Sequence, residues 1–101
     1  MALEAMLSAD EKTMIIKMDD KFDFGKVQDF RNSYSNLPES VKTIEVDLAD
    51  TEYMDSSALG MLLNMQKVLG TAISRYVISH SRPQVLKILT ISRFDKKFDI
   101  K

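Results

Sequence analysis

The chain contains no cysteine, no tryptophan and only one histidine among its 101 residues. Without a thiol it has no disulfide, no thiolate nucleophile and no cysteine-based metal site, which fits a reducing compartment. Three glycines and two prolines are too few for a fibrous repeat or a low-complexity, disordered chain. The remaining composition, 45% hydrophobic and 29% charged, is typical of a protein that folds around one core.

The chain also lacks a strong excess of charge and a long apolar run. Its 14 basic and 15 acidic residues leave a formal net charge of −1, which provides no electrostatic attraction to nucleic acid or to an anionic membrane. No apolar stretch reaches the ~18 residues of a membrane-spanning helix, and the first residues lack the pattern of a signal peptide. We therefore expect a single cytoplasmic domain over residues 1–101, with proteins or small molecules as partners and neither nucleic acid nor membrane.

Alternating hydrophobic residues predict the strands. The segment 41–48 is the clearest, because Ile44, Val46 and Leu48 alternate with polar side chains. Its polar face indicates a sheet that helices do not cover on both sides. Shorter strands are expected at residues 3–7, 13–18, 73–79 and 97–100.

Helical spacing of apolar residues predicts three helices, at residues 24–37, 56–69 and 83–89. The first follows Asp23, an acceptable N-cap, and ends at Pro38 after about four turns. Its apolar face is expected to comprise Phe24, Val27, Phe30, Tyr34 and Leu37. The second ends at Gly70, a natural C-cap. Strands that alternate with helices predict an α/β fold with right-handed crossovers and functional loops at the carboxyl ends of the strands.

The segment MDSSALGMLL, residues 54–63, places an acid and two hydroxyls directly before an apolar helix. Serine is a preferred N-cap, so spacing alone favours capping as the role of the serines. A helix N-terminus also offers free N–H groups and a favourable dipole, which can hold a phosphate. A phosphoserine there would add about −1.5 to −2 charges beside Asp55.

A rotation of about 100° per residue divides this second helix into two faces. The core face is expected to comprise Ala58, Met61, Leu62, Met65, Val68 and Leu69. The opposite face comprises Ser56, Leu59, Gly60, Leu63 and Lys67. Either the two leucines of that face pack under a neighbouring element, or they form an exposed apolar patch that binds a protein, with Gly60 allowing a close approach of the partner's backbone.

Residues 54–60, MDSSALG, together with the preceding strand TIEVDL (43–48), resemble the DSSGLG signature of STAS domains, in particular bacterial anti-sigma factor antagonists. The segment KFDF (21–24) is similar to the family's turn before the first helix. FDFG (22–25) and KILTISRF (87–94) look most like the HsbA-type single-domain antagonists. The resemblance covers nearly the whole chain and implies an STAS-like fold, with a mixed sheet of four to five strands and helices packed mainly on one face.

The resemblance also implies a function. It makes Ser56, the first serine after the acid, the phosphoacceptor, surrounded by Asp23, Asp55 and Ser57. An antagonist of this family binds an anti-sigma factor or a switch serine kinase while it is unphosphorylated, and a serine phosphatase of the PP2C type restores it after phosphorylation. Such a protein is a substrate of these enzymes, with no catalytic residue, metal or cofactor of its own.

Two alternatives start from the same residues. An enzyme would need a base beside a hydroxyl nucleophile, but His80 is the only histidine, and no G-x-S-x-G elbow or phosphate-binding glycine loop is present. The acids Asp19, Asp20 and Asp23 lack EF-hand spacing, which favours an acidic turn over a metal site. An STAS-like subunit of a transport system or a signalling scaffold would keep the fold without a phosphoswitch.

Overall fold

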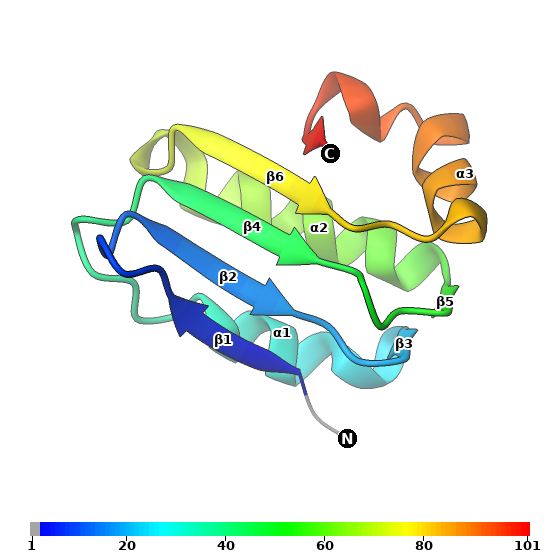
Figure 1. Cartoon of the computed structure of the whole chain (residues 1–101), viewed down its shortest axis with the longest axis horizontal. Helices are drawn as coiled ribbons and strands as arrows, with labels where there is room; N and C mark the ends of the chain where they lie inside the picture. The colour runs from blue at the N-terminus through cyan, green and yellow to red at the C-terminus, as the bar shows by residue number, and fades with distance from the viewer. Residues whose placement is uncertain (1–2) are drawn as a thin grey trace.

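A computed structural model describes residues 3–101. Its main sheet consists of β1 (Glu4–Leu7), β2 (Thr13–Lys17), β4 (Thr43–Asp47), β6 (Arg75–Ser79) and β7 (Asp99–Ile100). The strands lie in the order β1-β2-β4-β6-β7, and only β1 is antiparallel to its neighbour (Figure 1). The expected strands are thus confirmed, with somewhat shorter bounds.

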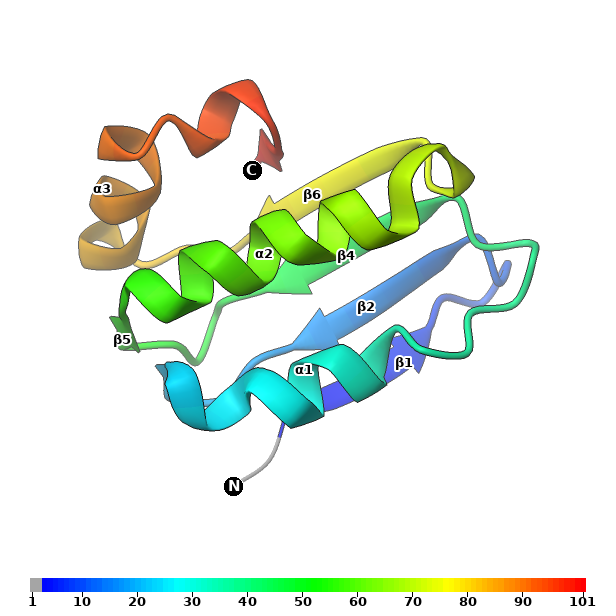
Figure 2. The same cartoon turned by 180° about the vertical axis from the view of Figure 1, so that it is seen from behind.

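Three helices accompany the sheet: α1 (Val27–Ser33), α2 (Ser56–Leu69) and α3 (Pro83–Ile91). Short 3-10 segments follow or precede them: η1 (Phe24–Lys26), η2 (Gly70–Ala72) and η3 (Phe94–Lys96). Figure 2 shows α1 and α2 side by side across one face of the sheet, with α3 and η3 on the far side of α2 from α1. The α/β fold with a mixed sheet and helices mainly on one face is therefore confirmed. Within the described part of the chain, no helix is long and apolar enough to cross a membrane.

The core lies between the sheet and the two helices. Ile16, Ile44 and Ile78 from adjacent strands are fully buried and face Phe30 of α1 and Leu62 of α2 across a continuous hydrophobic cluster. The opposite sheet face is polar, as expected. There the Ser79 hydroxyl donates to Glu45 at 2.8 Å, and Arg75 pairs with Asp99.

A second sheet was not expected. The two-residue strands β3 (Lys21–Phe22) and β5 (Tyr53–Met54) pair in parallel, with Phe22 opposite Met54 and both side chains buried. Two residues are too few for an alternating pattern to be recognised in a sequence. This small sheet joins the segments that precede α1 and α2.

Two expectations about the helices are wrong. The first helix covers residues 24–33 rather than 24–37. It begins as a 3-10 turn, which rotates more tightly than an α-helix. Phe24 therefore leaves the apolar face and is 73% exposed. The hydroxyls of Ser33 and Ser35 donate to backbone carbonyls near its end and help to terminate it. Val68 is 63% exposed, because it lies at the margin of the core-facing arc of α2.

Candidate functional site

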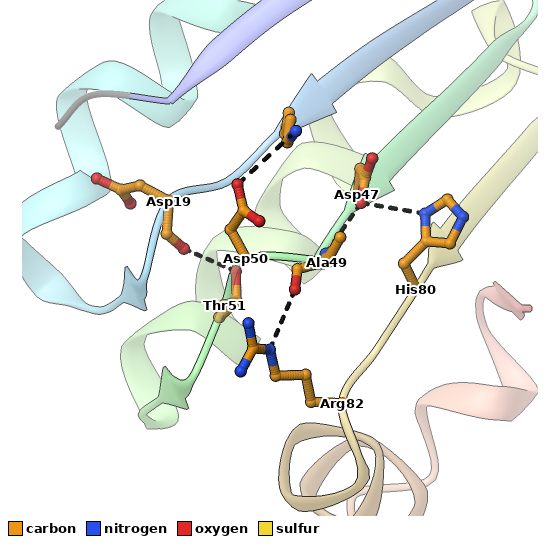
Figure 3. A network of polar contacts seen from close by, with 8 residues as sticks. Asp19, Asp47, Ala49, Asp50, Thr51, His80 and Arg82 are labelled. Carbon is orange, nitrogen blue, oxygen red and sulfur yellow. Dashed lines mark hydrogen bonds and ion pairs between the residues drawn. The ribbon is translucent and has the colours of Figure 1, made fainter.

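The carboxyl ends of β2, β4 and β6 lie at one edge of the sheet, and the loops that follow them are linked by hydrogen bonds (Figure 3). The Thr51 hydroxyl is buried and donates to the backbone carbonyl of Asp19 at 2.8 Å. Arg82 Nε donates to the carbonyl of Ala49 at 3.1 Å. The loop between β4 and β5 is therefore held on both sides, and it gives α2 a fixed starting point.

The small sheet brings Asp23 and Asp55 together. Each follows directly after a paired strand, and the backbone N–H of Asp55 donates to the carbonyl of Phe22 at 3.3 Å. The two aspartates, which are 32 positions apart in the sequence, thus leave neighbouring strands in the same direction. The structure therefore places both expected acidic neighbours of Ser56 at the beginning of α2.

Asp55, and not a serine, is the N-cap of α2. Its carboxylate accepts a hydrogen bond from the backbone N–H of Ala58 at 3.2 Å, and its backbone is extended. Ser56 and Ser57 are consequently the first two helical residues. The interpretation of the serines as caps is wrong, because the acid one position earlier satisfies the N–H that a serine would have bound.

Asp23 performs the corresponding role at the first helix. Its carboxylate accepts a hydrogen bond from the backbone N–H of Gly25 at 3.0 Å and caps η1. A Cβ atom on Gly25 would approach this carboxylate to 3.3 Å, so glycine suits the tight turn. Phe24, between the two, projects into solvent next to the small sheet. Sequence reasoning missed this exposed aromatic residue, although the glycine after it was a signal for a turn rather than a regular α-helix.

The exposed face of α2 carries Ser56, Gly60, Leu63 and Lys67, which we call the α2 ridge. Ser56, Gly60 and Lys67 are exposed, and Leu63 is 38% exposed. Leu59 is half-buried and packs against the core, so the expectation of burial is right for Leu59 and exposure is found only at Leu63. Ser57 is half-buried.

Gly60 has no structural requirement within the described chain. Apart from its chain neighbours and the adjacent backbone of the helix itself, no atom lies within 4 Å of a Cβ built on it, so an alanine would fit without a clash. Glycine in a helix interior is less stable than alanine by about 0.5–1 kcal/mol. A close approach from outside the chain would explain why the less stable residue is present.

Charge at the carboxyl edge of the main sheet is predominantly negative. Asp19 is buried, and its carboxylate lies 3.2 Å from the ammonium of Lys26, which is itself largely buried. In residues 3–101 no ion pair involves Asp23 or Asp55. Ser56 therefore directly follows Asp55 at the end of the small sheet that also carries Asp23, and neither carboxylate forms an ion pair within the described chain.

The only histidine of the sequence, His80, does not belong to the group formed by Ser56, Asp23 and Asp55. His80 Nδ1 lies 3.1 Å from the carboxylate of Asp47, and its side chain is 64% exposed (Figure 3). Neither Ser56 nor Ser57 is a hydrogen-bond partner of this ring among the described residues. Over the same residues no group of three histidine or acidic side chains is arranged to hold a metal ion.

Comparison with known proteins assigns the family. Residues 5–100 match the family model described as "Mlab, STAS domain". A STAS-domain containing protein from Pseudomonas aeruginosa (strain UCBPP-PA14) is 40% identical over 100 residues, and the alignment covers 99% of each chain.

Solved structures show the same fold at lower sequence identity. The unphosphorylated form of the anti-sigma factor antagonist SpoIIAA has a TM-score of 0.70 and 22% identity, over 89% of this chain and 83% of that chain. The phosphorylated form of SpoIIAA from Bacillus has a TM-score of 0.72 and 20% identity, over 99% and 91%. An anti-sigma factor antagonist from Mycobacterium paratuberculosis has a TM-score of 0.77 and 14% identity, over 98% and 85%.

Proposed function

This chain belongs to the STAS domain family, and we propose that it is a bacterial anti-sigma factor antagonist controlled by phosphorylation of Ser56. In its unphosphorylated form it binds an anti-sigma factor or a switch serine kinase through the α2 ridge. The kinase phosphorylates Ser56 and releases the complex, and a phosphatase of the PP2C type restores binding. The chain acts in the cytoplasm as a substrate of these enzymes and not as an enzyme itself.

The observation that carries this proposal is the cap at Asp55. Because the carboxylate of Asp55 binds the N–H of Ala58, the hydroxyl of Ser56 is not needed to begin the helix. It lies exposed on the same face as Gly60 and Leu63. The neighbouring hydroxyl of Ser57 belongs to a half-buried residue, which favours Ser56 as the group that a kinase reaches.

A phosphate on Ser56 would leave the fold intact and change the ridge. The N-terminus of α2 stabilises an anion through its dipole and its free N–H groups, so the helix tolerates the added charge. The phosphate would lie beside the carboxylates of Asp23 and Asp55 and raise the negative charge there by about 1.5 to 2 units. A partner that fits a neutral hydroxyl and the apolar Leu63 would then have to desolvate a dianion, which opposes binding.

Similarity to SpoIIAA supports the same conclusion. SpoIIAA is an anti-sigma factor antagonist whose structure is known in an unphosphorylated and a phosphorylated form, and this chain matches both forms with nearly equal TM-scores, 0.70 and 0.72. A phosphorylated residue is thus compatible with this fold.

The test is partner binding by four forms of the chain: wild type, Ser56→Ala, Ser56→Asp and the matched control Ser57→Ala. Partners captured from the source bacterium are identified by mass spectrometry, and their affinities are measured by calorimetry. We expect wild type, Ser56→Ala and Ser57→Ala to bind an anti-sigma factor or switch kinase with similar affinity. Ser56→Asp should bind about 100-fold more weakly, a loss within the range for a charge buried without a partner.

Equal binding by all four forms would contradict the switch. If the captured proteins were then subunits of a transport system or signalling scaffold, the adaptor alternative would hold instead. Phosphate found on Ser57 alone after treatment with the captured kinase would contradict the assignment of Ser56.

A further inference from the structure

The segment η3 packs on α3 and β7 and is bonded to one side of α2. The side-chain amide of Gln66 donates to the backbone carbonyl of Lys97 at 2.8 Å, which joins the end of η3 to the third turn of α2. Phe94 and Phe98 are buried and stack on each other with ring centroids 5.6 Å apart. These anchors hold η3 in a fixed position beside the ridge, on the side of α2 that faces away from α1 (Figure 2).

Basic residues are concentrated in this part of the chain. Residues 82–101 contain six basic and two acidic residues, whereas residues 1–81 contain eight basic and 13 acidic residues. Three of the basic residues, Arg93, Lys96 and Lys97, follow α3 and are exposed; we call them the η3 rim. In the ion pairs found over residues 3–101 none of the three takes part.

The backbone conformation of Arg93 also favours a functional role for its side chain. Its φ of 62° and ψ of 31° are left-handed, at the position after a helix where glycine is usual. A residue with a Cβ is less stable there than glycine. A functional need for the guanidinium would account for arginine at this position.

We propose that the η3 rim binds a carboxylate-rich segment of the protein that docks on the α2 ridge, an inference that rests on the proposed function. The charges along the ridge then differ in sign: Asp23 and Asp55 precede the two helix starts beside Ser56, while Lys67 lies near the end of α2 and Lys97 of the rim is bonded to the neighbouring Gln66. A partner with apolar groups opposite Leu63 and acidic groups opposite η3 would fit in one orientation only. The phosphate would act at the opposite end from the rim and would not neutralise it.

A protein segment fits this surface better than nucleic acid. The chain carries a net charge of −1, and Asp95 lies within the rim itself. The neighbouring ridge offers the apolar side chain of Leu63. A polyphosphate backbone would be repelled by the acidic residues at the other end of the ridge, whereas a peptide combines acidic with apolar side chains.

The first test uses a defined probe. A glutamate-only peptide is titrated into isotopically labelled protein and followed by NMR, with a duplex DNA of equal total charge as the competing probe. We expect the peptide to shift the amide signals of residues 66–67 and 93–97, and to leave those of the exposed Lys12 and Lys42 in place. Equal shifts at all exposed lysines, or stronger shifts at the rim with DNA than with the peptide, would overturn the proposal.

The second test measures the affinity of the protein that wild type captures in a Ser56-dependent manner. The double variant Lys96→Glu/Lys97→Glu is compared with Lys12→Glu/Lys42→Glu, which changes the net charge equally outside η3 and the α2 ridge. We expect an affinity about tenfold lower for the rim variant, with a weaker dependence on salt, and little change for the control. If the two variants bind equally while Ser56→Asp still abolishes binding, the rim is wrong and the switch stands; if Ser56→Asp binds as wild type does, the proposed function itself fails.

Discussion

The starts of the first helix and of α2, both at the carboxyl edge of the sheet, have the same capping contacts but carry different surfaces. Asp23 and Asp55 leave paired strands side by side, and each caps the helix that follows. After Asp23 come an exposed phenylalanine and a glycine, and Lys26 of the same turn holds the buried Asp19. After Asp55 come two hydroxyls and an exposed ridge. The same capping chemistry therefore supports a structural ion pair at one start and leaves an exposed, unneeded hydroxyl at the other.

The largest difference in stability should come from Lys26. Lys26→Met removes the ammonium from the buried Asp19, and we expect a loss of about 3 kcal/mol in the free energy of unfolding, the lower end for buried pairs because Lys26 is partly exposed. Denaturant unfolding measures this loss. Lys67→Met on the exposed ridge is the control, with a change within about 0.5 kcal/mol. Equal effects at the two lysines would mean that the ion pair does not stabilise the first helix start.

The two caps should contribute similar amounts. Asp55→Ala and Asp23→Ala each remove one carboxylate–amide hydrogen bond, and we expect a loss of about 1 kcal/mol for each. Ser56→Ala should cost less than either, because Ser56 does not cap the helix. A loss for Ser56→Ala as large as that for Asp55→Ala would show that the serine takes part in capping and would weaken the argument for its availability.

The smallest effect should have the opposite sign. Gly60→Ala places a methyl group in open space on a helix, and we expect the free energy of unfolding to rise by about 0.5–1 kcal/mol. Affinity for the captured partner should fall in the same variant, because the methyl group would separate the two surfaces. Thermal unfolding and calorimetry on one preparation test both changes, and a variant that is more stable and binds equally well would remove Gly60 from the interface.

Sequence patterns anticipated most of the fold. The strand at Thr43–Asp47 and the helix at Ser56–Leu69 were recognisable because each repeats its period several times. The small sheet was not, because two residues do not complete a period. Phe24 was misplaced for a related reason, since its 3-10 turn rotates differently from the α-helix whose spacing was assumed.

The candidate site, like the fold, was predictable from the sequence only in part. Family resemblance pointed to Ser56 with Asp23 and Asp55, and the wheel geometry of one helix gave the ridge. Whether a leucine of that face was exposed depended on neighbouring elements that are distant in the sequence, so Leu59 packs on the core while Leu63 remains partly exposed. The η3 rim could not be foreseen, because only the bond from Gln66 to Lys97 shows that η3 lies beside α2.

By itself the sequence determined the periodic elements, the polar and apolar faces of the central strand and the acid–hydroxyl segment before α2, because these depend on residues a few positions apart. Only the tertiary structure decided that Asp23 lies beside Asp55 and that basic residues of η3 flank the ridge. Those relations join residues about 30 positions apart, and pairing of β3 with β5 and packing of η3 on α2 bring them together.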